Sequence, residues 1–150
     1  MLSKLVGIDP LVAGMNFDRI VWKIIDSDKS FNLSKKEVRN SVEQYKKFLS
    51  LKRKYPDSEL VPTEEIDSVW HVHILDTKNY ADDCNMLFGK FLNHEPYFGP
   101  YSKESQEDMA RWFEETSIFW QMEYGEVLQE PVRFRCKGKA CHAPGNCRCR

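Results

Sequence analysis

The sequence predicts an all-α protein, an irregular bundle of four to five helices followed by a cysteine-rich and mostly irregular C-terminal tail. Three observations predict this class. Apolar residues recur at steps of three and four through several separate segments, which is the period of an amphipathic helix. Residues that start or stop helices stand at the ends of those segments. The only strand-like run is the short one from Val132 to Arg135.

Residues 1–15 contain two glycines and a proline, and they predict an irregular lead-in. Asn16 is a favourable N-cap for a helix that begins at Phe17, with Asp18 in its first turn. We expect this helix to end near residues 26–28. Its buried stripe consists of Ile20, Val21, Ile24 and Ile25.

The next helix is predicted over residues 35–54. Ser34 and Glu37 stand three apart, as a capping box requires. Tyr55 ends the helix, because the residue before a proline avoids the α conformation. The positions on one side of the helix follow a spacing of four and three and are Val38, Val42, Tyr45, Phe48, Leu49 and Lys52. The charge-rich stretch 46–54 is interpreted as a solvated face.

Thr63 opens the central helix, whose first turn holds two glutamates that favour a helix N-terminus. A break is expected at residues 75–77, where Asp76 would be the N-cap of a further helix that closes at Gly89. The buried faces of the two helices are Ile66, Val69, Trp70, His73 and Ile74 in the first and Tyr80, Cys84, Leu87 and Phe88 in the second.

Residues 91–101 predict a loop rich in aromatic residues and proline, and the last long helix is expected from Ser102 to Gly125. Its periodic residues are interpreted as core and not as a base-stacking platform: Met109, Trp112, Phe113, Thr116, Phe119, Trp120 and Tyr124. The chain then divides into a helical domain, residues 1–130, and a basic tail, residues 131–150.

The formal net charge of -1 gives no indication of a nucleic-acid partner or an acidic substrate. Residues 132–150 carry six Lys or Arg and no Asp or Glu, which suits only weak, salt-sensitive contact with phosphates. Asp9 and Pro10 interrupt the first apolar run too early for a signal peptide, and no segment resembles a membrane span. We therefore expect a cytoplasmic protein without membrane contact.

One short stretch in the middle of the chain concentrates the residues that bind metals or carry protons. Residues four apart share a helical face, whereas residues two apart point about 200° from each other. His71 and His73 therefore cannot bind one ion from a regular helix. The spacing allows the pairs Asp67 with His71 and His73 with Asp76. The first pair would be two ligands, or a carboxylate that orients an imidazole, and His94 is the best third donor.

Each of the other residues also has a purely structural interpretation. Helix capping explains Asp76. His73 lies on the apolar face, which fits a buried imidazole bonded to a backbone carbonyl. Cys84 is either a small core residue or, as a thiolate, a further donor. His94 fits a turn. The stretch lacks the His-Glu-x-x-His zinc signature, so spacing alone leaves these alternatives open.

The tail is the second candidate metal site. It offers five soft donors: Cys136, Cys141, His142, Cys147 and Cys149. The spacing of the first two cysteines just fits zinc, whereas the last two stand closer together than zinc pairs usually do. Three interpretations stay open for the tail: a metal site, disulfides, or an unstructured segment with free thiols.

The segment from Val61 to Gly99 resembles the glycine-rich domain-containing protein-like family. The resemblance rests on the motif Val-Pro-Thr-x-x-Ile-Asp-x-Val-Trp-His-x-His-Ile-Leu-Asp-Thr-x-x-Tyr-x-x-Asp-Cys-x-x-Leu-Phe-Gly-x-Phe-Leu-x-His-x-Pro-Tyr-Phe-Gly. The preceding helix, with Tyr45-x-x-Phe48-Leu49, extends it, so that most of the chain to about residue 125 is covered. This is a domain of uncharacterised function, present in plant glycine-rich domain proteins and in short bacterial proteins.

The resemblance supplies a shared motif but implies no mechanism and no catalytic roles. The matching positions are Trp70, His71, His73, Asp76, Tyr80, Asp83, Cys84 and His94. The signalling or RNA-related roles proposed for the plant members are not carried over, because the long glycine-rich region is not found here. The cysteine-rich tail lies outside the resemblance.

Two functions from different classes follow. The first is a small binding or accessory module for a protein partner or a small ligand, with the His/Asp cluster as a metal or ligand pocket. The alternative is a metal-dependent enzyme, a hydrolase or a non-haem iron oxygenase, that uses Asp67, His71 and His94. Two histidines and one carboxylate are the donor set of the iron(II) facial triad, so zinc or iron is the expected ion. Convergence of these three side chains on one open point would favour the enzyme.

Overall fold

The structure, a computed structural model, describes residues 7–27, 32–95 and 103–129. Within these residues it contains helices and no strand, so the all-α prediction is confirmed. None of the described helices is long and apolar enough to cross a lipid bilayer. The elements are α1 (Pro10–Ala13), α2 (Asp18–Trp22), the π-helical turn η2 (Lys23–Ser27), α3 (Lys35–Lys54), α4 (Glu64–Leu75), α5 (Thr77–Phe88) and α6 (Lys103–Tyr124).

The N-terminal segment is more ordered than the sequence predicts. Helix α1 lies inside the expected irregular lead-in and begins with Pro10, whose fixed φ suits the first helical position. Asp9 caps it by accepting a hydrogen bond from the Leu11 N–H at 2.8 Å. At α2 the side chain of Asn16 accepts a bond from the Asp18 N–H at 2.8 Å, although the N-cap position is one residue later than predicted.

Helix α3 has the predicted bounds, and its capping box is present. Ser34 N–H donates to the Glu37 carboxylate at 2.7 Å, and Glu37 N–H donates to the Ser34 hydroxyl at 3.3 Å. The prediction that residues 46–54 form a solvated face is wrong for Lys47. This side chain is buried, and its ammonium lies 2.8 Å from the carboxylate of Glu126, because α3 meets the segment after α6 at this point.

Helices α4 and α5 form at the predicted break. Thr63 caps α4, and its hydroxyl accepts a bond from the Ile66 N–H at 3.3 Å. Asp76 occupies the N-cap position of α5, but the predicted capping bond is absent. Its carboxylate instead accepts a bond from the Asn79 amide at 2.8 Å and pairs with Arg19 of α2 at 3.3 Å. This carboxylate therefore joins α2 to the α4–α5 junction.

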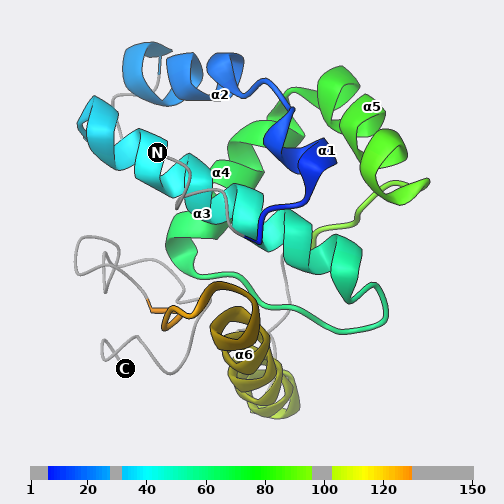
Figure 1. Cartoon of the computed structure of the whole chain (residues 1–150). Coiled ribbons are helices and arrows are strands. Elements are labelled where there is room, and N and C mark those ends of the chain that lie inside the picture. The colour runs from blue at the N-terminus through cyan, green and yellow to red at the C-terminus, as the bar shows by residue number, and fades with distance from the viewer. Residues whose placement is uncertain (1–6, 28–31, 96–102, 130–150) are drawn as a thin grey trace.

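The core lies where α3 packs against α4, with α1 and α2 also against α3 and α5 against α4 (Figure 1). Burying each large apolar side chain here contributes about 1.5–3 kcal/mol. The largest fully buried side chains include Tyr45, Phe48, Leu49, Leu51, Ile66, Val69, Tyr80 and Trp120. This packing fixes α4 in place, and with it the two faces that carry His71 and His73.

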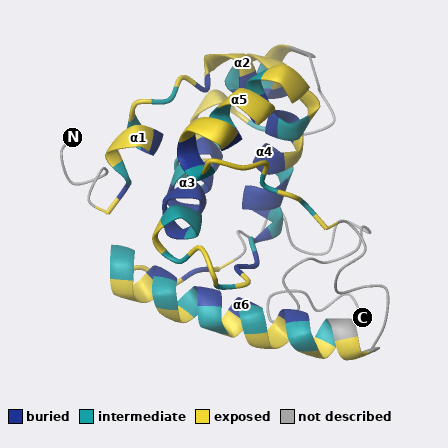
Figure 2. Cartoon of the chain, turned by 90° about the vertical axis from the view of Figure 1, so that its right-hand side faces the viewer, coloured by how far each residue is buried: buried dark blue, intermediate teal, exposed yellow. Residues whose placement is uncertain are grey.

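Helix α6 runs across one end of the other helices, and its buried residues lie along the edge that faces them (Figure 2). The contacts are made by side chains. Tyr55 stacks on Phe119 with ring centroids 4.1 Å apart, and the Val61 N–H donates to the Thr116 hydroxyl at 2.9 Å. Since α6 does not pack its backbone closely on α3 or α4, space remains between α6 and the N-terminal half of α4.

The hydroxyl of Thr116 is fully buried and is the partner of the Val61 N–H. We expect Thr116→Val, which keeps the shape, to lower the free energy of unfolding by about 1–3 kcal/mol, because a buried N–H loses its acceptor. Urea denaturation followed by circular dichroism measures the change. Ser117→Ala is the control, because that hydroxyl bonds only to Phe113 O in its own helix, so the change should stay within about 0.5 kcal/mol. Equal stability of the two variants would contradict the role of this bond.

Candidate metal centre

Three of the predicted site residues meet at one point. Asp67 and His71 lie one turn apart on α4, and His94 follows α5 in the extended segment 90–95. The Nε2 atom of His94 lies 2.6 Å from Asp67 Oδ1 and 3.1 Å from His71 Nε2. His71 Nε2 lies 3.5 Å from Asp67 Oδ2. The structure therefore brings together the trio named from the sequence.

These separations suit ligands of one ion. Donor atoms about 2.1 Å from a shared metal ion lie about 3.0 Å apart at octahedral angles and about 3.4 Å apart at tetrahedral angles. The three separations in the cluster run from 2.6 to 3.5 Å and bracket these two values. Small side-chain rotations are enough to equalise them around an ion.

Hydrogen bonds alone do not satisfy all three contacts at once. Each imidazole Nε2 either carries one proton or offers one lone pair. If His94 Nε2 donates its proton to Asp67, it has no lone pair left in the ring plane for His71 Nε2. The 3.1 Å approach of the two nitrogens is then unsupported. An ion between them would accept the lone pairs of both imidazoles and of the carboxylate.

Asp67 is the buried member of the cluster. Its side chain is 4% exposed, against 13% for His94 and 50% for His71. A buried carboxylate needs a compensating positive charge or several hydrogen bonds. The cluster thus combines a buried anion with two imidazoles that are open to solvent to different degrees, which leaves one side of the trio accessible.

Two aromatic residues position His94. The indole N–H of Trp70 donates to the Tyr80 hydroxyl at 2.9 Å, and that hydroxyl donates to the backbone carbonyl of Leu92 at 2.5 Å. The Trp70 ring also meets the His94 ring edge-on, with centroids 4.5 Å apart. Burial raises the pKa of Tyr80, so its hydroxyl keeps the proton that it donates. The segment that carries His94 is thereby tied to α4 and α5.

His73 points away from the cluster and into the core, where it is 3% exposed. Its Nδ1 lies 2.6 Å from the Tyr45 hydroxyl, and its Nε2 lies 2.7 Å from Asp83 Oδ2. The predicted pairing with Asp76 is therefore wrong, as is the expected bond to a backbone carbonyl. Burial lowers the pKa of His73, and the hydrogen bond that its ring donates to the Asp83 carboxylate partly offsets that effect. With both ring nitrogens engaged, this histidine is a structural residue.

Cys84 is also outside the cluster. It is 2% exposed and packs in the core, and burial raises the pKa of its thiol. A thiol with a raised pKa is a poor metal ligand at neutral pH, which agrees with the interpretation of a small core residue. The tail donors Cys136, Cys141, His142, Cys147 and Cys149 lie outside the described residues, so their three interpretations remain open.

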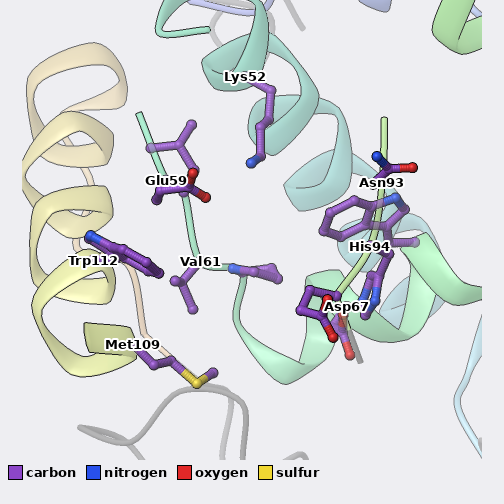
Figure 3. Close-up of a pocket in the computed structure, with 12 residues that line it drawn as sticks. Lys52, Glu59, Val61, Asp67, Asn93, His94, Met109 and Trp112 are labelled. Atoms are coloured by element: carbon purple, nitrogen blue, oxygen red, sulfur yellow. Dashed lines mark hydrogen bonds and ion pairs between the residues drawn. The ribbon is translucent and has the colours of Figure 1, made fainter. Parts of the chain in front are cut away.

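A cavity of about 270 Å³ opens beside the cluster, and Asp67 and His94 form part of its wall (Figure 3). Met109 and Trp112 of α6 form the opposite wall. The side chain of Lys52 extends from α3 into the space between these two walls. The remaining lining residues are Glu59, Leu60, Val61, Pro62, Trp70, Asn93 and Glu95. The trio is thus accessible to a small molecule.

Sequence reasoning missed most of the residues that line this cavity, Lys52 and Trp112 among them. Lys52 was counted with the solvated face of α3, yet it occupies a position in the apolar stripe, and that position was the signal available. Trp112 was assigned to the core, but it is only half-buried and lines the cavity. The spacing of the apolar residues in this helix could not reveal the cavity, because apolar residues that line a cavity recur at the same steps as those that pack in a core.

Comparison with known proteins agrees with the resemblance stated from the sequence. The model of the UCP032817-like family matches residues 11–117. Glycine-rich domain-containing proteins 1 and 2 of Arabidopsis thaliana are 32% and 30% identical to this chain over 92 residues. Each match covers 59% of this chain and 11% of the relative, so the chain corresponds to a small part of those proteins. No solved structure gives a significant match.

The Tyr45 hydroxyl is fully buried against His73. We expect Tyr45→Phe to lower the free energy of unfolding by about 1–3 kcal/mol, because one imidazole nitrogen then stays buried without a partner. Chemical denaturation of the two proteins measures the loss. Tyr55→Phe is the matched control, since that hydroxyl bonds to Glu123 near the surface, and its effect should be smaller. A larger effect at Tyr55 would contradict the buried network.

Proposed function

The chain belongs to the UCP032817-like family, and we propose that its helical domain binds one divalent transition-metal ion through Asp67, His71 and His94. One observation carries the proposal: the three potential ligand atoms lie within 4.8 Å of one another beside an open cavity. Exposed acidic groups often gather without a metal, but here the carboxylate is buried and two imidazoles converge on it.

Zinc and iron(II) are the ions that this donor set favours. Two histidines and one carboxylate bind zinc in sites that keep a fourth position open, and they bind iron(II) as a facial triad. Calcium and magnesium prefer oxygen ligands and are disfavoured by the two imidazoles. A cytoplasmic location, as expected from the sequence, is part of the same proposal.

The position of the trio supports a role in binding a small molecule. The three protein side chains would bind the ion from one side and leave its other coordination positions free. Two of these residues, Asp67 and His94, are also part of the cavity wall. A purely structural metal site would instead be closed by four protein ligands. We infer that the domain is a binding module whose ion takes part in ligand recognition.

Metal analysis of the full chain purified without added metal tests this proposal. We expect about one zinc or iron per chain, with the affinity reduced more than about 100-fold in His94→Ala and in Asp67→Asn, because losing a ligand costs more than losing a supporting hydrogen bond. Asp76→Asn is the matched control at the end of the same helix and should bind normally.

Replacing the four tail cysteines by serine in the full chain separates the two candidate sites. Metal that is retained in this variant and lost in His94→Ala belongs to the central cluster. Metal that is lost only with the tail cysteines would overturn the proposal, as would an unchanged metal content in both ligand variants.

The second candidate function is a metal-dependent enzyme, and the observation that favours it is the same open side of the trio. Zinc would supply a bound water with a pKa near 7 for hydrolysis, whereas iron(II) would supply oxygen chemistry. We expect a hydrolase to act on simple esters only when loaded with zinc, and an oxygenase to take up dioxygen only when loaded with iron(II). Activity that survives in His71→Ala and Asp67→Asn would exclude this cluster as its source.

A further inference from the structure

Among the described residues that line the cavity beside the trio, Lys52 is the one with an ammonium group. Its ammonium enters from α3 between the α6 wall and the His94 wall (Figure 3). It lies 5.6 Å from the centroid of the Phe48 ring, and among the described residues it forms no ion pair. The other lysines near this end of α3, Lys47 and Lys54, are both paired with glutamates of the C-terminal part. Lys52 is therefore a positive charge that the fold places in a cavity without an ion-pair partner among the described residues.

The charge balance of the cavity depends on the proposed ion. Among the described lining residues, the three carboxylates of Glu59, Asp67 and Glu95 outnumber the single ammonium when no metal is bound. Glu59 and Glu95 are exposed, and water screens their charges, whereas Asp67 is buried. A divalent ion on Asp67 cancels the buried negative charge. Lys52 is then the unpaired charge that an incoming molecule meets.

Partial burial in the cavity disfavours the charged form of the Lys52 side chain. Loss of water around the ammonium lowers its pKa, and the charge of Glu59 only partly offsets this effect. A ligand that carries an anionic group would restore the lost solvation with a charge-assisted hydrogen bond. The apolar lining residues suit an aromatic ring or an aliphatic group of the ligand. They are Val61, Pro62, Met109 and Trp112. At about 270 Å³, the cavity fits a compact molecule.

We propose that the metal-loaded cavity binds a small organic acid, with its carboxylate on Lys52 and its apolar body between Trp112 and the metal cluster. This inference rests on the proposed metal site, because the ion balances Asp67. It names the class of ligand, a compact aromatic or alicyclic carboxylate, and it makes Lys52 the residue that selects for an anion.

The probes are 2-naphthoate and its neutral isostere 2-naphthamide, titrated by calorimetry into the zinc-loaded full chain. We expect naphthoate to bind more tightly than naphthamide. Lys52→Met keeps most of the apolar stem and should weaken naphthoate binding about 10- to 100-fold while leaving naphthamide binding unchanged. Lys52→Arg keeps the charge and should retain most of the affinity. Lys54→Met is the matched control on the exposed side of α3 and should behave as wild type.

Zinc content and circular dichroism are measured on every sample, so that failures of the two proposals are distinguished. Zinc bound at one per chain together with equal naphthoate affinity in wild type and Lys52→Met would overturn this inference alone, since the carboxylate would then bind elsewhere. The same holds if neither probe binds the zinc-loaded wild type. Absence of bound zinc in the folded wild type would overturn the proposed function, and with it the charge balance that this inference requires.

Discussion

The buried carboxylate of Asp67 is the constraint on which the site depends. An ionised carboxylate that is nearly removed from water is strongly unfavourable unless positive charge or hydrogen-bond donors compensate it. Two imidazoles approach it, His71 from the next turn of α4 and His94 from beyond α5. The fold therefore concentrates at one point the groups that a transition-metal ion requires, and it leaves one side of that point facing a cavity.

Helix α4 separates two histidines that the sequence places two residues apart. His71 faces outward with Asp67 and His94, the proposed metal ligands, and His73 faces inward between Tyr45 and Asp83. The inward network fixes the rotation of α4 against α3, because a buried imidazole bonded on both sides tolerates little movement. That rotation in turn holds Asp67 and His71 toward His94. The structural histidine and the proposed ligand histidine thus depend on each other through one rigid helix.

Helix α6 determines what can reach the trio. It is attached by side chains, among them Thr116 and Phe119, and its backbone stays apart from α3 and α4. The space that results is lined by Lys52 on one element and Trp112 on another, which no local pattern connects. A carboxylate ligand, as proposed, would be recognised by residues from α3 and α6 and would meet the ion on α4. Recognition and metal binding would then lie on different elements of the same cavity.

The sequence by itself determined the longer helices, the Ser34–Glu37 capping box, the Gly89 stop and the opposite directions of His71 and His73, because these follow from local geometry. It also suggested His94 as the third donor, through residue type alone. Only the tertiary structure decided that Tyr80 ties the His94 segment to α4, that Asp83 and not Asp76 pairs with His73, and that Lys52 enters a cavity. Those facts depend on contacts between distant segments, which sequence periodicity does not encode.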